Sequence, residues 1–191
     1  MRQSAHHESG HVLVAMRWLG RVPVEVSIYP AAGGKLGHAS IPVTVGERHL
    51  LTDAEWRRVR VPEAAMFLAG LAAEEVAGFG RSSEVAEMAA MVRIQGRGAK
   101  NYALTMNSLP PVHKATNDVD AALAALVDAF PTRRHLLWRL LRVYSFTLAF
   151  LRASTTALVR LADALVARPH LAADDIEKVV APDVAVRRKP R

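Results

Sequence analysis

The chain contains 191 residues with a formal net charge of +7, and 51% of the residues are hydrophobic. This length and apolar content are enough for one compact domain with its own core. Cysteine is absent, which excludes disulfides and thiolate metal sites, and the longest uncharged apolar run, residues 143–151, has about half the length that spans a bilayer. We therefore expect a cytoplasmic protein with neither a signal peptide nor a transmembrane segment.

The first predicted element is a helix over residues 4–19, in which apolar residues recur at helical spacing from Val12 to Leu19. Gly10 lies inside this helix, where it costs about 1 kcal/mol relative to alanine. We expect it to be there because another segment, or a substrate, approaches the helix closely at this point.

Residues 7–11 of this helix read His-Glu-Ser-Gly-His. His7 and His11 are four positions apart, so they project from one helical face and lie close enough to share a zinc ion. Glu8 can hydrogen-bond a water in the open position of the metal and take its proton, which makes a hydroxide nucleophile near neutral pH. The pattern predicts Glu8 as a catalytic base and Zn²⁺ as the cofactor. The alternative is a solvated helix that carries two histidines by chance.

The rest of the chain predicts further helices and one small sheet. Two short strands, at residues 24–28 and 36–41, are expected to pair as a hairpin. Thr52 and Glu55 form a capping-box pattern at the start of a short helix. Further helices are predicted at residues 63–78, 82–95, 117–129, 133–152 and 155–168, the last two as a helical hairpin, and a short last helix at 173–180. The predicted fold class is mainly α with a small β-hairpin or sheet.

A series of segments, in the same order along the chain, resembles the peptidase domain of the FtsH/paraplegin family of zinc proteases. The resemblance rests on HESGHVLV at 7–14, VEVSIYP at 24–30, GGKLGHASIP at 33–42, LLTDAEW at 50–56, LAGLAAEEVAGFG at 68–80, ATNDVDAAL at 115–123, LVRLADALV at 158–166 and HLAADDIEKVV at 170–180. Together these segments span nearly the whole chain. The resemblance implies a zincin-like metallopeptidase helical domain.

By this resemblance, residues 1–186 form a single domain with C-terminal helices at 133–180, followed by a basic tail at 187–191. Two positions depart from the family. Leu71 stands where the family usually has arginine, and the stretch 81–114 is longer than the corresponding link, so we interpret it as an insertion. The sequence also contains no phosphate-binding loop of the G-x-x-x-x-G-K-[ST] type. The ATP-driven unfolding of the family is therefore not carried over.

The third zinc ligand is less constrained than the histidine pair. Asp118 is the first candidate, because Asn117 can cap the helix that begins there and because the resemblance places the family's aspartate ligand at this position. Glu74 and Glu75 are the alternatives, since other zinc peptidases with the same pentad take a glutamate from a later helix. Otherwise we expect one of these glutamates to hold a zinc-binding histidine in place. Weaker candidates are His113, Glu84 and His6.

The sequence leads us to expect a zinc metalloendopeptidase that hydrolyses peptide bonds in unfolded or flexible polypeptides and lacks an ATPase module. Leu36, Gly37, His38 and Ala39 are the candidate substrate-binding residues, because their strand could be a sheet edge with which an extended peptide pairs. A plain hairpin that covers the core is the alternative for this strand.

The expected partners are a peptide or unfolded protein substrate and a separate ATPase or unfoldase or a second copy of the chain. No nucleic-acid motif accompanies the basic tail, so no nucleic-acid partner is expected. Two other functions stay open. One is a catalytically inactive, FtsH-like zinc-binding or interaction domain, and the other is a helical interaction protein whose histidines bind no metal.

Overall fold

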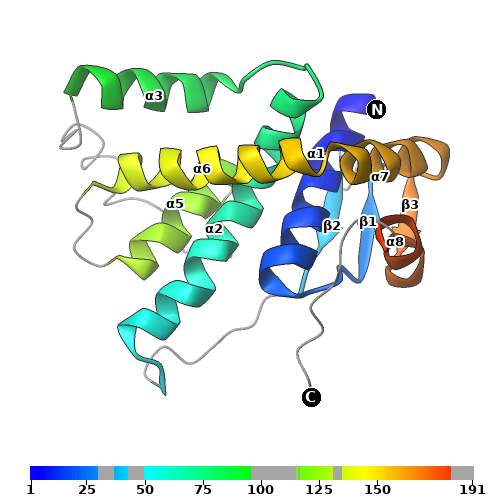
Figure 1. The fold of residues 1–191 in the computed structure, drawn as a ribbon, viewed down its shortest axis with the longest axis horizontal. Helices are drawn as coiled ribbons and strands as arrows, with labels where there is room; N and C mark the ends of the chain where they lie inside the picture. Colours follow the sequence, from blue (N-terminus) through cyan, green and yellow to red (C-terminus); the bar gives the residue numbers. More distant parts are fainter. Residues whose placement is uncertain (30–36, 43–49, 96–114, 116, 131–134, 182–191) are drawn as a thin grey trace.

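The computed structural model describes residues 1–29, 37–42, 50–95, 115, 117–130 and 135–181. This part of the chain is mainly helical, with one small antiparallel sheet of three strands (Figure 1). The fold class expected from the sequence is confirmed at this level. None of the helices in the described part is long and apolar enough to cross a membrane.

The N-terminal helix α1, Arg2–Val14, continues as a π-helical segment, Ala15–Leu19, which ends at the left-handed Gly20. Its partner is α2, Asp53–Val76, and the two helices pack against each other in opposite directions (Figure 1). Gly10 marks their closest approach, because a Cβ atom there would collide with the main-chain oxygen of Ala69. The expectation that Gly10 admits a neighbouring segment is confirmed.

Helix α2 is the central helix of the molecule and contacts α1, α5 and α6. The predicted capping box is present, with the Thr52 hydroxyl accepting the Glu55 amide hydrogen and the Glu55 carboxylate accepting the Thr52 amide hydrogen. The two separate helices expected here are instead one helix that passes through Pro62. A proline inside a helix costs about 3 kcal/mol, and burial of α2 against three other helices offsets that cost.

Three of the later helices lie close to the predicted ranges: α3, Ser83–Gln95; α5, Asp118–Ala129; and α8, Ala173–Val180. The expected helical hairpin is wrong. Helix α6, Leu136–Ala153, packs mainly on α2, and α7, Thr155–Ala167, packs mainly on α1. Only Ser154 separates α6 from α7, which is too short a link for the chain to fold back, so the helices follow one another along the molecule (Figure 1).

The sheet has the strand order β2-β1-β3 and lies beside α1, α7 and α8 (Figure 1). Its strands are β1, Glu25–Ser27; β2, His38–Ser40; and β3, His170–Ala172. Val26 lies opposite Ala39 on one side and Leu171 on the other. The antiparallel pairing of the first two strands agrees with the prediction, whereas β3 was not predicted. Strand β2 is an edge of the sheet within the described residues.

Candidate metal centre

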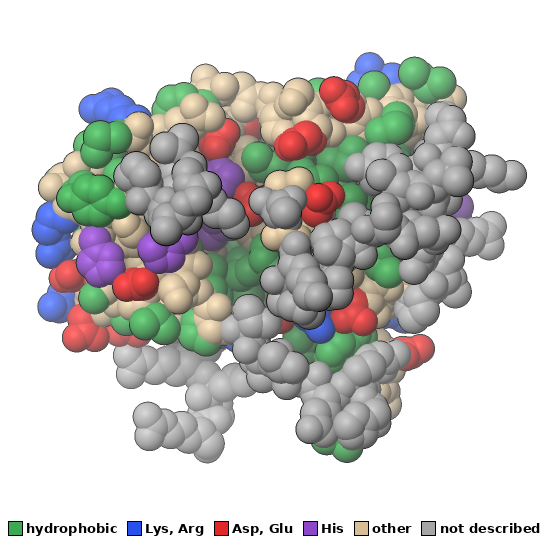
Figure 2. All heavy atoms as spheres, turned by 180° about the vertical axis from the view of Figure 1, so that it is seen from behind, with side chains coloured by type: hydrophobic (Ala, Val, Ile, Leu, Met, Phe, Trp, Pro, Cys, Tyr) green, Lys and Arg blue, Asp and Glu red, His purple; other side chains and the backbone are tan. Residues whose placement is uncertain are grey.

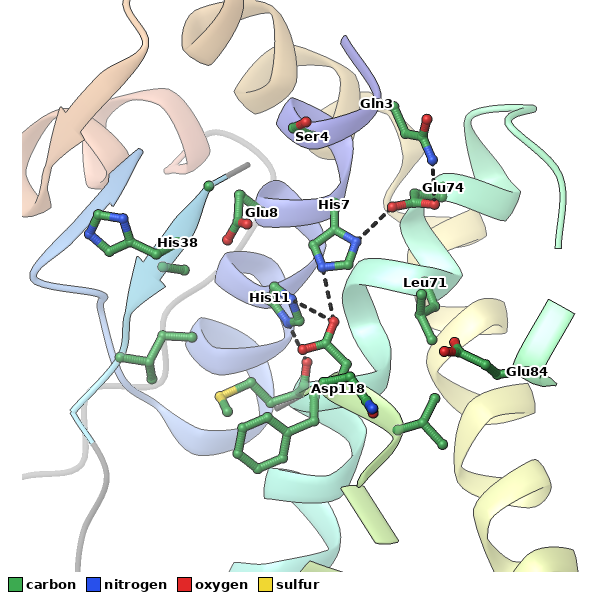
Figure 3. A pocket seen from close by; sticks show the side chains of 17 residues that line it. Gln3, Ser4, His7, Glu8, His11, His38, Leu71, Glu74, Glu84 and Asp118 are labelled. Carbon is green, nitrogen blue, oxygen red and sulfur yellow. Dashed lines mark hydrogen bonds and ion pairs between the residues drawn. The ribbon is translucent and has the colours of Figure 1, made fainter. Parts of the chain in front are cut away.

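Helix α1 places two imidazoles next to each other on the face that meets α2 and α5. The ring centroids of His7 and His11 are 4.8 Å apart. Each ring has one nitrogen directed at a neighbouring element and the other directed at Asp118 (Figure 3). The i, i+4 spacing therefore places the two imidazoles side by side on one face of the helix, as predicted.

The Nδ1 atoms of both histidines have hydrogen-bond partners on α2. His7 Nδ1 lies 2.7 Å from Glu74 Oε1, and His11 Nδ1 lies 2.7 Å from the main-chain oxygen of Met66. A carbonyl oxygen only accepts, so His11 must donate from Nδ1, and a neutral His7 beside a carboxylate does the same. These contacts leave Nε2 of each neutral ring with a free lone pair, which is the state that binds a metal.

Asp118 supplies the third atom of the cluster. It is the first residue of α5, and the side chain of Asn117 caps that helix by accepting the Asp120 amide hydrogen at 2.8 Å. Asp118 Oδ2 lies 2.9 Å from His7 Nε2 and 3.4 Å from His11 Nε2. The cap thus fixes the start of α5 where its first carboxylate reaches both rings.

These three residues have the chemistry and spacing of a zinc site. One ligand atom from each of His7, His11 and Asp118 lies within 4.8 Å of the others. Two ligands bound tetrahedrally at the usual zinc distances are about 3.3 Å apart, close to the separations from Asp118 to the two rings. Two imidazoles and one carboxylate, with a position left open, is a set that catalytic zinc sites use. The residues present therefore fit the metal that the sequence implies.

Glycine 70 on α2 makes room for one of the rings. A Cβ atom at Gly70 would lie 2.5 Å from Cε1 and Nε2 of His7. Any side chain at this position would push the imidazole from its place beside Glu74 and Asp118. The role of Gly70 was not predicted, although a glycine inside a predicted helix indicates a close contact at that position.

Gln3 and Met66 were missed as well. The Gln3 side-chain amide donates to Glu74 Oε2 at 2.9 Å and so holds the carboxylate that meets His7. The contribution of Met66 is its main-chain oxygen. No residue type is required for that contact, so no sequence signal marks it.

Glu8 lies in the cavity that adjoins the cluster. The cavity has a volume of about 680 Å³, and its lining includes His7, Glu8, His11 and Asp118 (Figure 3). The Glu8 side chain is buried next to Gly37, where a Cβ atom would lie 2.8 Å from Glu8 Oε1. Figure 2 shows, on the face opposite to that of Figure 1, histidine side chains gathered beside acidic ones.

The electrostatics of the metal-free cluster follow from burial and from Asp118. Burial alone lowers the pKa of His7, but the hydrogen bonds with Asp118 and Glu74 outweigh it and raise that pKa to about 10. His11 is affected in the same direction: burial lowers its pKa, but the charge of Asp118, the hydrogen bond with it and the charge of Glu8 together outweigh burial and raise that pKa. Burial opposes the charged form of Asp118 as well, yet the two imidazoles hold its pKa well below the usual range. Without metal, Asp118 therefore favours the protonated forms of both imidazoles.

The pKa of Glu8 moves the other way. Burial raises it, and the nearby charges of His11 and His7 only partly reverse the effect. A carboxylate with a raised pKa is a stronger proton acceptor than one at the surface. This is the property that a general base needs near neutral pH.

Of the two glutamates considered as alternative ligands, only Glu74 meets the cluster. Glu75 points toward α6 and the end of α2, where it accepts hydrogen bonds from Arg81 at 2.8 Å and 3.1 Å and from the Tyr144 hydroxyl at 3.0 Å. Its carboxylate therefore helps to tie α2 to α6. Glu74 contacts His7 on the nitrogen that faces away from Asp118, as expected of a residue that orients a ligand.

The weaker candidates lie apart from the three clustered atoms. Glu84, on α3, lines the same cavity, and His6 stacks edge-on against Phe79 with ring centroids 5.6 Å apart. His113 lies outside the described residues.

The candidate substrate-binding residues are at the opposite side of the cavity from α2. Gly37, His38 and Ala39 line it, and Leu36 lies outside the described residues. His38 Nε2 lies 3.1 Å from Glu25 Oε1 on the neighbouring strand. The edge strand β2 therefore borders the cavity that contains Glu8.

No protein-family model matches this chain, and a comparison with curated proteins gives no match either.

Proposed function

We propose that this chain is a zinc-dependent endopeptidase domain with a zincin-like fold, similar to the FtsH/paraplegin peptidases but without their ATPase module. The observation that carries the proposal is the convergence of His7 Nε2, His11 Nε2 and Asp118 Oδ2 beside a cavity that also contains Glu8. The sequence resemblance had placed the same residues in the same roles.

In this proposal His7, His11 and Asp118 hold the zinc ion, while Glu74 and the main-chain oxygen of Met66 orient the two rings. Bound zinc supplies Lewis-acid chemistry, in that it polarises a carbonyl group and makes water acidic near neutral pH. Glu8 accepts the proton of the attacking water and returns it to the leaving amine. Burial keeps bulk water from the Glu8 carboxylate, and Gly37 leaves the space that this carboxylate occupies.

The substrate class follows from the edge strand. Among the described residues, strand β2 has one neighbour in the sheet, and we propose that an extended peptide adds to its other side by main-chain hydrogen bonds. Such pairing requires little of the peptide's sequence but does require that it be unfolded. We therefore propose peptides and flexible or unfolded segments as substrates, with any unfolding supplied by a separate protein.

The test begins with metal content. Purified protein reconstituted with zinc and then dialysed should hold about one zinc ion per chain by elemental analysis, as the three-ligand site predicts. The double variant His7→Ala/His11→Ala should hold none. His170→Ala is the matched control, because His170 lies at the exposed far edge of the sheet and should not change zinc content. Equal zinc in the double variant and the wild type would refute the site.

Cleavage of an unstructured casein-like substrate then tests the activity. Glu8→Gln keeps the shape of the side chain but cannot accept a proton, so it should retain zinc and lose about 10²–10⁴-fold in rate. Near-wild-type cleavage by this variant would refute the role of Glu8. A zinc-loaded wild type that cleaves none of the unstructured substrates would support the catalytically inactive zinc-binding domain instead.

A further inference from the structure

We infer that the cavity selects substrates with a basic side chain, and that Glu84 and Glu87 on α3 are the residues that make this selection. The inference rests on the proposed peptidase function and names a substrate class for it. It begins from a second, smaller cavity of about 160 Å³. The two cavities share the residues Glu84, Asn117 and Val119, so the smaller one opens beside the metal cluster.

The smaller cavity has an apolar floor and an acidic rim. Met88 and Val119 are buried, and Met91 is half-buried beside them. Glu84, Glu87 and Asp120 complete the lining. A lysine or arginine side chain matches this arrangement, because its aliphatic stem packs on apolar surface while its charged head remains beside carboxylates.

The described residues that line the two cavities carry charge of the opposite sign to the net charge of the chain. The chain carries a net charge of +7, yet none of the described residues that line either cavity is lysine or arginine. Exposed charges farther apart than about 10 Å are largely screened at 0.1 M salt, so the nearby carboxylates decide which peptide charge is favoured. A basic side chain is attracted locally, although the molecule as a whole is cationic.

Glu84 and Glu87 are better placed for this role than Asp120. Figure 3 shows the Glu84 carboxylate pointing from α3 toward Leu71 and the metal cluster, and the Ser82 hydroxyl donates a hydrogen bond to this carboxylate at 3.1 Å. Asp120 accepts a hydrogen bond from the Asn117 amide at 3.0 Å and so belongs to the cap of α5.

The test uses matched peptides that differ at one position, with lysine, glutamine or glutamate placed in turn at each site around one cleavable bond. Binding is measured first, by fluorescence anisotropy with the zinc-loaded Glu8→Gln chain, so that affinity is read without turnover. At one position or more, the lysine peptide should bind about 3–10-fold more tightly than the glutamate peptide, as expected for partly exposed ion pairs. The preference should shrink as salt is raised from 0.05 M to 0.5 M.

The variant Glu84→Gln/Glu87→Gln, made in the same background, should reduce that preference to less than about twofold. Asp163→Asn is the control, since it removes one negative charge on the exposed side of α7 and should leave the preference intact. Circular dichroism confirms that each variant is folded. Equal binding of lysine and glutamate peptides, no binding of any peptide, or a preference that survives the double substitution would overturn the inference.

The proposed function and this inference fail in different ways. If the wild type cleaves the lysine, glutamine and glutamate peptides equally well, the proposed peptidase activity is supported and the proposed selection is refuted. If zinc-loaded wild type cleaves no peptide while the Glu8→Gln chain still binds the lysine series preferentially, the selection stands and the peptidase falls.

Discussion

The single carboxylate oxygen that meets both imidazoles makes Asp118 the residue on which the candidate centre depends most. Asp118 Oδ2 is 2.9 Å and 3.4 Å from the two Nε2 atoms, whereas the nearest glutamate, Glu74, contacts only the opposite nitrogen of His7. Asp118, Glu74 and Glu75 therefore have three different positions: the first is in the cluster, the second is behind a histidine, and the third bonds Tyr144 of α6. Zinc affinity distinguishes these positions.

We predict that Asp118→Ala lowers zinc affinity by more than 100-fold, because it removes a metal–oxygen bond and leaves two histidines. Glu74→Ala should cost about 10–100-fold, as is typical of partners that orient a ligand. Glu75→Ala should leave zinc affinity nearly unchanged, since its carboxylate bonds Arg81 and Tyr144. Chelator-competition titration measures all three. Loss of zinc from Glu74→Ala with retention by Asp118→Ala would show that the ligand is the glutamate.

At the scale of elements, the centre is the product of two helices in register. The contacts of α2 with the histidines come from positions 66, 70 and 74, one helical turn apart, and they meet positions 11 and 7 of α1. Residues spaced by four share one face of a helix, so a single stripe of α2 serves both rings. Gly10 sets the depth of this contact, because it brings the α1 backbone against Ala69.

We predict that Gly70→Ala has opposite effects on stability in two backgrounds. Alanine is more favourable than glycine in a helix by about 0.8–1.0 kcal/mol, so the change should stabilise a chain that lacks the His7 ring. With the ring present, the new methyl group would lie 2.5 Å from it, so the change should lower both the free energy of unfolding and the zinc affinity. Urea unfolding of Gly70→Ala, His7→Ala and the double variant forms the cycle. Additive effects would show that the glycine and the ring do not interact.

The residues that form local patterns were predictable, and those that depend on tertiary contacts were not. The helical pair at 7 and 11, the capping box at Thr52 and the Asn117 cap all arise from neighbours in sequence, and the structure contains each of them. Strand β3 was missed because it has only three residues, which are too few for an alternating pattern to be recognised in the sequence. The contact of Met66 with His11 was not predictable, since a main-chain oxygen carries no residue identity.

The arrangement of α6 and α7 was mispredicted for a related reason. Each has an apolar face of the right period, but periodicity does not say which helix covers that face. Helix α6 packs on α2 and α7 packs on α1, and both partners are distant in sequence. An insertion at 81–114 could have displaced the start of α5, yet α5 begins at the cluster, where the Asn117 side chain caps it.

At the scale of the whole molecule, protons would compete with the proposed zinc ion for the same two rings. The metal-free chain gains stability from the imidazolium forms, because the pKa of His7 rises from 6.5 to about 10 on folding. That contribution is fully present below pH 6.5 and is lost as the pH rises through about 10. Zinc requires the neutral rings, so its binding releases protons and strengthens as the pH rises.

We predict that the melting temperature of the metal-free chain falls between pH 6.5 and pH 10, while the stabilisation that zinc adds grows over the same range. Differential scanning fluorimetry of the metal-free and zinc-loaded chains, at constant ionic strength, measures both. His7→Ala/His11→Ala is the control, since it should show neither trend. A metal-free melting temperature that rises with pH in this window would contradict the assigned charge state of the cluster.

The stripe of α2 behind the histidines also bears on how such a centre can be inherited. Position 66 contributes only its backbone, and the other two contacts need just a glycine and, four residues later, a glutamate. Natural selection for a metal centre of this kind would therefore constrain few residue identities in α2 and would leave most of the surrounding sequence free to vary. Distant relatives with such a centre should keep three short motifs: His-Glu-x-x-His on one helix, Gly-x-x-x-Glu on a second helix, and Asn-Asp at the start of a third helix. They should keep it after overall identity has faded.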